Sequence, residues 1–99
     1  MMNKPISDKD YFNRQVKMFK ALGHPNRLGI INILRDGEHC VYYIKSHLGL
    51  DQAYCSQQLA ILRKVGLVKS HRDGQNVIYK VVDPRLYVVA NIIEDLAKL

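Results

Sequence analysis

Two short segments with helical periodicity meet at Gly49-Leu50, and this junction limits the possible folds more than any other feature of the sequence. Segment 41–48 ends at Gly49, the residue type that most often closes a helix in the left-handed conformation. Asp51 is placed to cap a second helix over 52–65. The apolar positions that would face inward are Val41, Ile44, Leu48, Cys55, Leu59 and Leu62. Two helices joined so tightly predict a helix-turn-helix.

Further helices are predicted on both sides of this motif. Helical periodicity marks 8–22, where Ser7 is a suitable N-cap, and a second segment that starts at Pro25 and ends at Asp36-Gly37. A last helix is predicted over 85–99. We expect residues 1–7 to be flexible, since chain ends order poorly unless they are tied down.

A hairpin is predicted between the motif and the last helix. The β-prone runs 67–72 and 75–82 flank Asp73-Gly74, a dipeptide that favours a two-residue turn. Such a turn pairs Val68 with Tyr79 and Ser70 with Val77 on one face. The predicted fold class is mainly α with a small β-hairpin: a dimeric winged helix-turn-helix of order α-α-α-α-β-β-α, in a single domain over residues 1–99.

The last helix carries more apolar residues than one small core can cover. Apolar surface of this kind on a terminal helix is most simply covered by a second chain. We therefore expect 8–22 and 84–99 to be dimerisation helices. The expected interface residues are Tyr11, Phe12, Phe19, Val89, Ile92, Ile93 and Leu96.

Charge and composition narrow the choice of partner and compartment. The 99 residues have a formal net charge of +6 and a pI near 9.5, which suits nucleic acid or an acidic membrane surface. No apolar run approaches the roughly 20 residues of a membrane span. Residues 1–7 are polar, without the apolar run that we would expect of a secretory signal, and Cys40 and Cys55 are too few for a secreted disulfide framework. We expect a cytoplasmic protein without membrane contact.

The predicted second helix of the motif and the hairpin offer side chains suited to duplex DNA. Amides and hydroxyls can read base edges in the major groove, and Gln pairs well with adenine; the basic and amide residues of the hairpin tip can contact phosphates or the minor groove. The predicted recognition-helix residues are Gln52, Ala53, Tyr54, Ser56, Gln57 and Gln58, with Gln52 and Gln57 as the preferred base readers. The predicted wing residues are Lys69, His71, Arg72, Gln75 and Asn76.

The stretches Phe19-Lys-Ala-Leu-Gly-His-Pro-Asn-Arg-Leu and Leu59-Ala-Ile-Leu-Arg-Lys-Val-Gly-Leu-Val, with Asp73-Gly74 and Tyr79 after them, resemble the ArsR/SmtB family of winged-helix regulators. The resemblance extends from Phe19 to Leu96. It implies a homodimeric repressor that leaves its operator when an inducer, often a metal or a thiol-reactive species, binds. Two recognition helices in successive major grooves imply an operator of double-stranded DNA that is an imperfect inverted repeat, with half-sites roughly 34 Å apart.

At most positions where that family carries metal ligands, this sequence has residues of other types. The stretch Glu38-His-Cys-Val-Tyr-Tyr43 keeps only the first thiolate of the family's Glu-Leu-Cys-Val-Cys-Asp motif, at Cys40, with Tyr42 in place of the second, and 85–99 contains no His. We therefore expect no bound metal and no other cofactor. A thiol switch through Cys40 and Cys55 stays open as a hypothesis; the alternative is that Cys55 is a small buried apolar residue.

Other classes of function are also compatible with this fold. The sequence contains no phosphate-binding glycine loop, nucleophile elbow or HExxH motif, so we expect no enzyme. A winged-helix module that contacts protein or RNA is the main alternative, since fold does not fix function. A regulator with no inducer of its own is another.

Overall fold

The computed structural model describes residues 7–99. The expected flexibility of residues 1–7 thus lies outside the described residues, apart from Ser7, whose Oγ accepts a hydrogen bond from the Asp10 amide at 3.2 Å and caps the first helix. In chain order the elements are α1 (Asp8–Leu22), α2 (Pro25–Ile33), a 3₁₀ turn (Leu34–Asp36), β1 (His39–Cys40), α3 (Val41–Leu48), α4 (Gln52–Lys64), β2 (Val68–Asp73), β3 (Asn76–Val81) and α5 (Arg85–Ala97). Every predicted helix is present.

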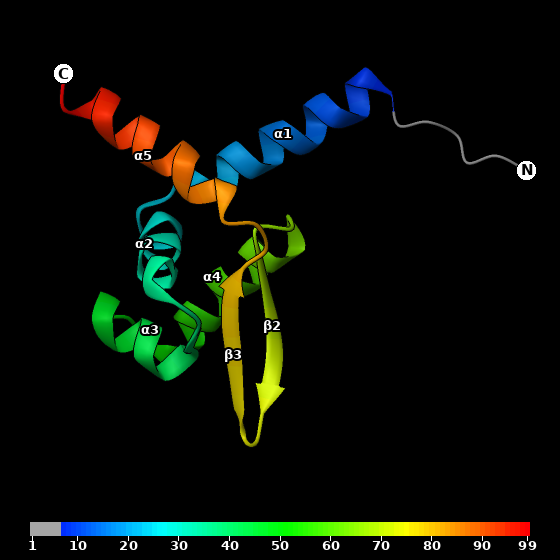
Figure 1. Cartoon of the computed structure of the whole chain (residues 1–99). Coiled ribbons are helices and arrows are strands. Elements are labelled where there is room, and N and C mark those ends of the chain that lie inside the picture. Colours follow the sequence, from blue (N-terminus) through cyan, green and yellow to red (C-terminus); the bar gives the residue numbers. More distant parts are fainter. Residues whose placement is uncertain (1–6) are drawn as a thin grey trace, which may run out of the picture.

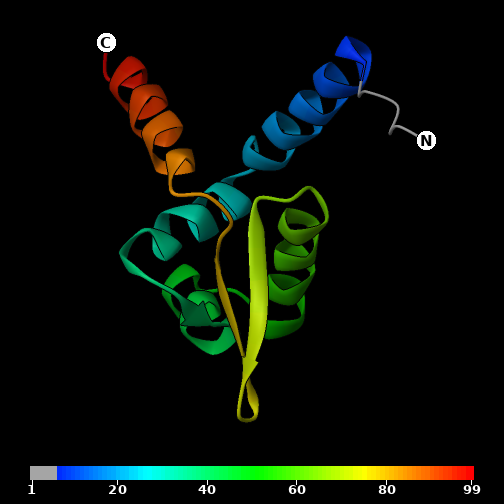
Figure 2. The same cartoon turned by 45° about the vertical axis from the view of Figure 1, so that its right-hand side comes forward.

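Helices α2, α3 and α4 form a body with the sheet along one side, and α1 and α5 rise from one end of this body (Figure 1). Figure 2 shows α1 and α5 diverging from each other, with the β2–β3 hairpin pointing the opposite way. The far ends of α1 and α5 therefore extend away from the body, while Ala21 at the end of α1 is buried in its core. No helix within residues 7–99 is both long and apolar enough to cross a membrane.

The core lies where α2, α3 and α4 meet. Its fully buried side chains include Ile30 and Ile31 of α2, Ile44 of α3 and Leu59 of α4. Helices α2 and α3 approach closely at Gly29, where an added Cβ would lie 2.9 Å from a Leu48 methyl carbon. Helix α5 contributes no fully buried residue, and of its side chains only Leu86 and Tyr87 pack against the core.

The sheet has one strand more than the sequence predicted. Its strand order is β1-β3-β2, all antiparallel, with His39 opposite Tyr79 and Cys40 opposite Ile78. Strand β1 has only two residues, too short for any alternation of polar and apolar residues to reveal. This third strand ties the start of α3 to the hairpin.

The predicted hairpin register was wrong. Ser70 pairs with Tyr79 instead of Val77, and Val68 pairs with Val81 instead of Tyr79. The turn residues are consequently Gly74-Gln75, with Gly74 at φ +63° in the first position, as a type II′ turn requires. A displacement of two residues along β3 keeps the side chains on the predicted face of the sheet.

Candidate nucleic-acid interface

The turn between α3 and α4 is built by glycine geometry and a carboxylate cap. Gly49 adopts φ +66° and ψ +35°, the left-handed conformation, and the Leu50 amide donates to the Lys45 carbonyl at 2.9 Å. The Asp51 carboxylate then accepts a hydrogen bond from the Tyr54 amide at 3.2 Å. The start of α4 is therefore fixed at the position that the sequence predicted.

Helix α4 has one buried face and one exposed face. Cys55, Leu59 and Leu62 are fully buried against the core. The residues that the structure leaves exposed near the start of α4 are Gln52, Ala53, Ser56 and Gln57. These four gather on one surface, so amide and hydroxyl groups at the N-terminal end of α4 are free to meet base edges.

Gln58 does not belong to this exposed surface, which corrects its predicted role in DNA binding. It is only 7% exposed, and its Oε1 accepts a hydrogen bond from Arg27 Nη1 at 2.8 Å. Gln58 follows Cys55 by three positions and precedes Leu62 by four, so it shares their face of the helix. That spacing was the signal in the sequence that could have revealed its burial.

Tyr54 is half-buried and already has one partner. Its hydroxyl oxygen accepts a hydrogen bond from Asn26 Nδ2 at 3.1 Å. The phenol can still donate its own proton, because a hydroxyl acts as donor and acceptor at once. Tyr54 therefore lies between the core and the exposed surface of α4.

All the predicted wing residues are exposed: Lys69, His71, Arg72, Gln75 and Asn76. They are spread along the hairpin, with Asn76 opposite Asp73 next to the turn and His71 opposite Ile78. His71 Nε2 lies 3.8 Å from Glu38 Oε1, and Arg63 at the end of α4 donates to Ser70 Oγ at 3.3 Å. The second contact joins the recognition helix to the base of the wing.

Helix α3 carries a pair of residues that sequence reasoning missed, an exposed Tyr42 and a half-buried Lys45. Tyr42 is 66% exposed, and Lys45 Nζ lies 4.7 Å from the centre of its ring, a cation-π distance. In DNA-binding helix-turn-helix proteins the first helix of the motif crosses the phosphate backbone. The signal was available in the sequence, because Tyr42 and Lys45 fall between the inward positions of α3.

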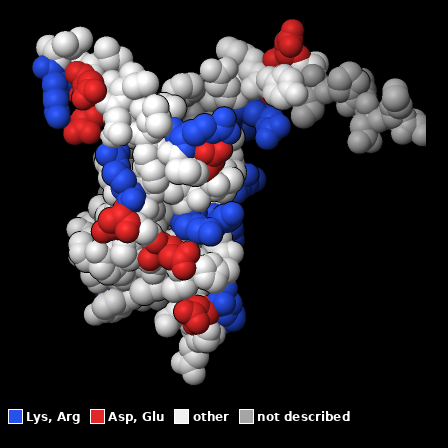
Figure 3. All heavy atoms as spheres, in the orientation of Figure 1, with Lys and Arg blue, Asp and Glu red and all other residues white. Residues whose placement is uncertain are grey.

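The net positive charge is not concentrated in one patch on the face shown in Figure 3. Lys and Arg side chains there alternate with Asp and Glu from the terminal helices down to the hairpin. Among the ion pairs of the molecule, Arg85 Nη2 lies 2.7 Å from Asp83 Oδ2, and the hydrogen bond from Arg85 holds the pKa of the Asp83 carboxyl below its ordinary value. Binding of a polyanion to this face therefore depends on individual basic side chains and not on one broad positive patch.

The two cysteines are free thiols in different surroundings. Cys55 is fully buried, and this burial raises the pKa of its thiol. Cys40 is half-buried in β1 at the N-terminal boundary of α3. Among residues 7–99, no group of three or more His, Cys, Asp and Glu side chains is arranged to hold a metal ion.

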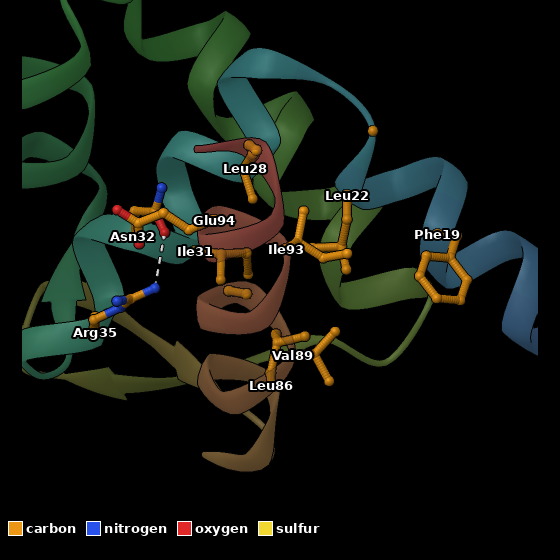
Figure 4. A pocket seen from close by; sticks show the side chains of 13 residues that line it. Phe19, Leu22, Leu28, Ile31, Asn32, Arg35, Leu86, Val89, Ile93 and Glu94 are labelled. Atoms are coloured by element: carbon orange, nitrogen blue, oxygen red, sulfur yellow. Dashed lines mark hydrogen bonds between the residues drawn. The ribbon is translucent and has the colours of Figure 1, made fainter. Parts of the chain in front are cut away.

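An apolar pocket of about 660 Å³ separates α1, α2 and α5. Figure 4 shows Phe19 of α1, Ile31 of α2 and Ile93 of α5 around it, with Arg35 at one side. Every residue predicted at the dimer interface is between 42% and 62% exposed: Tyr11, Phe12, Phe19, Val89, Ile92, Ile93 and Leu96. The single chain therefore leaves these apolar side chains of α1 and α5 half-exposed, on the side of the molecule opposite the hairpin.

Comparisons with known proteins agree on the kind of protein to which this arrangement belongs. Residues 24–70 match the family model described as "Bacterial regulatory protein, arsR family". The HTH-type transcriptional regulator Rv0081 of Mycobacterium tuberculosis is 35% identical over 80 residues, which cover 80% of this chain and 70% of that protein. The biofilm growth-associated repressor of Xylella fastidiosa is 30% identical over 79 residues, covering 80% and 69%.

A solved structure extends the likeness over nearly the whole chain. The homodimeric winged helix-turn-helix DNA-binding domain Mb0332 from Mycobacterium bovis, described as a possible ArsR-family transcriptional regulator, has a TM-score of 0.84 at 26% identity. The match covers 96% of this chain and 91% of that one.

Proposed function

This chain belongs to the arsR family of bacterial regulatory proteins and is a DNA-binding transcriptional regulator, and from this premise we propose that it is a homodimeric repressor of an inverted-repeat operator. The M. bovis domain of the same fold is a homodimer, and the X. fastidiosa relative is a repressor. We assign the whole of residues 1–99 to a single domain that acts in the cytoplasm, without catalysis and without a bound metal or other cofactor.

The exposed N-terminal surface of α4 carries this proposal. Gln52 and Gln57 are free on a helix whose opposite face is fully buried, so the core presents their amides rigidly to a major groove. Ala53 and Ser56 lie beside them, and Tyr54 reaches the edge of the same surface. The wing residues Lys69, His71, Arg72, Gln75 and Asn76 contact phosphates or the minor groove next to the bases that α4 reads.

A second copy of the chain fills the apolar surface of α1 and α5. In a two-fold dimer the same residues serve both subunits, so each copy of Phe19 and Ile93 is covered by its partner. The hairpin points away from this surface (Figure 2), which directs both wings and both recognition helices to the same duplex. We expect half-sites roughly 34 Å apart, one helical turn of DNA.

Two modes of control fit the chain. A thiol switch would use Cys40, whose thiol is half-buried, and Cys55, whose burial disfavours the reactive thiolate. A regulator controlled by its abundance alone needs neither cysteine. Because Cys55 is buried and its thiol is held in the less reactive protonated form, control by abundance alone is favoured.

The test is selection of bound fragments from a random duplex pool by the purified protein, reduced and then oxidised, at a stated salt concentration. We expect an inverted repeat to be enriched in the reduced state. Loss of that repeat after oxidation, restored in a Cys40→Ser variant, would identify a thiol switch. Enrichment of no sequence in either state would reject the operator-binding role and favour contact with protein or RNA.

A further inference from the structure

Gln58 is the buried polar side chain among the described residues, and its only hydrogen-bond partner there is Arg27. It sits on α4 directly beside the fully buried Leu59, on the side that faces away from the exposed surface. An apolar residue of the same size would fill this place without needing a partner. The hydrogen bond therefore adds a directional link where packing alone would allow small rotations.

Arg27 carries this link on to α1. Its Nε donates to the Ala21 carbonyl at 2.7 Å while Nη1 donates to Gln58 Oε1 at 2.8 Å. Ala21 lies in the last turn of α1, where helix carbonyls lack partners within the helix. The planar guanidinium fixes the directions of its donors relative to one another. One side chain of α2 thus holds the end of α1 and the middle of α4 in a defined relation.

A second hydrogen bond acts one turn earlier on α4. Asn26, the neighbour of Arg27, donates from Nδ2 to the Tyr54 hydroxyl at 3.1 Å. Tyr54 and Gln58 are four residues apart, so they stand above one another on the same side of α4. Two contacts one turn apart define both the rotation and the inclination of the recognition helix against α2.

We propose that Arg27, through Gln58, is a positioning residue that sets the half-site spacing read by the dimer. This inference rests on the proposed dimerisation through α1 and α5. Because α1 belongs to the dimer surface and α4 to the DNA surface, the angle between them determines where the partner's recognition helix lies. A chain without this link keeps its base-reading residues but holds α4 less rigidly against the two-fold axis.

The experiment measures the preference of each variant for one spacing among duplexes whose half-sites are separated by spacers of different length. The double variant Arg27→Met, Gln58→Met replaces both side chains of this hydrogen bond with apolar ones, so neither is left as a buried unpaired group; the Ala21 carbonyl also loses its Arg27 donor. We expect it to remain dimeric and to lose preference for the parent's spacing by about tenfold, which corresponds to ~1.4 kcal/mol. Gln58→Glu keeps an acceptor for Arg27 and should retain the parent's preference.

Arg72→Ala in the wing is the control, because loss of a phosphate contact should weaken binding to every spacer alike. A dimeric double variant with the parent's spacing preference would overturn the inference. If the double variant does not fold, Arg27→Lys decides: its single ammonium cannot replace both directed donors, so an unchanged preference would overturn the inference equally. A monomeric parent, or one that selects no repeat, would instead reject the proposed function.

Discussion

Replacing Ile93 with alanine should weaken the dimer without unfolding the domain. Full burial of an isoleucine side chain is worth about 1.5–3 kcal/mol. Ile93 is 54% exposed in the single chain, so about 1 kcal/mol of that remains available for burial against a second copy. A two-fold interface contains the residue twice, which gives about 2 kcal/mol, or a roughly 30-fold higher dissociation constant.

Sedimentation equilibrium of the parent and the variant measures this constant directly. Ile61→Ala is the matched control, because Ile61 is 39% exposed on α4 and does not line the pocket between α1, α2 and α5. We expect the control to dimerise like the parent. Equal dissociation constants for Ile93→Ala and the parent would refute the placement of the dimer surface on α5.

Three further predictions concern the DNA surface and the buried thiol. Gln57→Ala should lose about 1–3 kcal/mol of operator affinity and relax specificity at one position in a mobility-shift assay, while affinity for random duplex stays unchanged. Arg72→Ala should weaken operator and random duplex alike and reduce the slope of log affinity against log salt by about 1 per lost phosphate contact. Burial raises the pKa of the Cys55 thiol, so the folded state favours the protonated form, and the free energy of unfolding should fall as pH rises past the thiol's ordinary pKa of 9.0. Urea titrations across that pH range should show a smaller fall for Cys55→Ala than for the parent. An identical fall in both proteins would contradict this assignment.

The sequence predicted the family and the order of the helices because the signals for both are local. The match to the arsR family confirms the resemblance, and Ser7, Gly49 and Asp51 each act at the helix end where they were expected. Caps depend on a few neighbouring residues and their backbone angles, so a short stretch of sequence contains all the information they need.

The errors arose where the outcome depends on distant partners. Strand β1 exists because His39 and Cys40 find β3 some forty residues later in the chain, and two residues alone carry no strand pattern. The hairpin turn moved by one position because a type II′ turn places Gly74 first. Gln58 was assigned to DNA by residue type, although the helix period put it on the buried face. Which exposed side chains touch DNA stays a prediction.

The many apolar residues that α5 leaves exposed are explained by recognition that requires two copies of the chain. Helix α5 has no buried residue, and an isolated helix of its 13 residues is marginal in water. Apart from Leu86 and Tyr87, which pack against the core, its apolar side chains add little to the stability of one chain and become buried only on association. A single recognition helix presents few base-reading side chains, each good pairing being worth about 1–3 kcal/mol of discrimination. Joining two such helices rigidly doubles that discrimination free energy, provided that the link from α1 to α4 holds them at one spacing. In the proposed dimer these features act together: the exposed face of α5 binds the second copy, the buried Gln58 positions α4, and the free Gln57 reads a base.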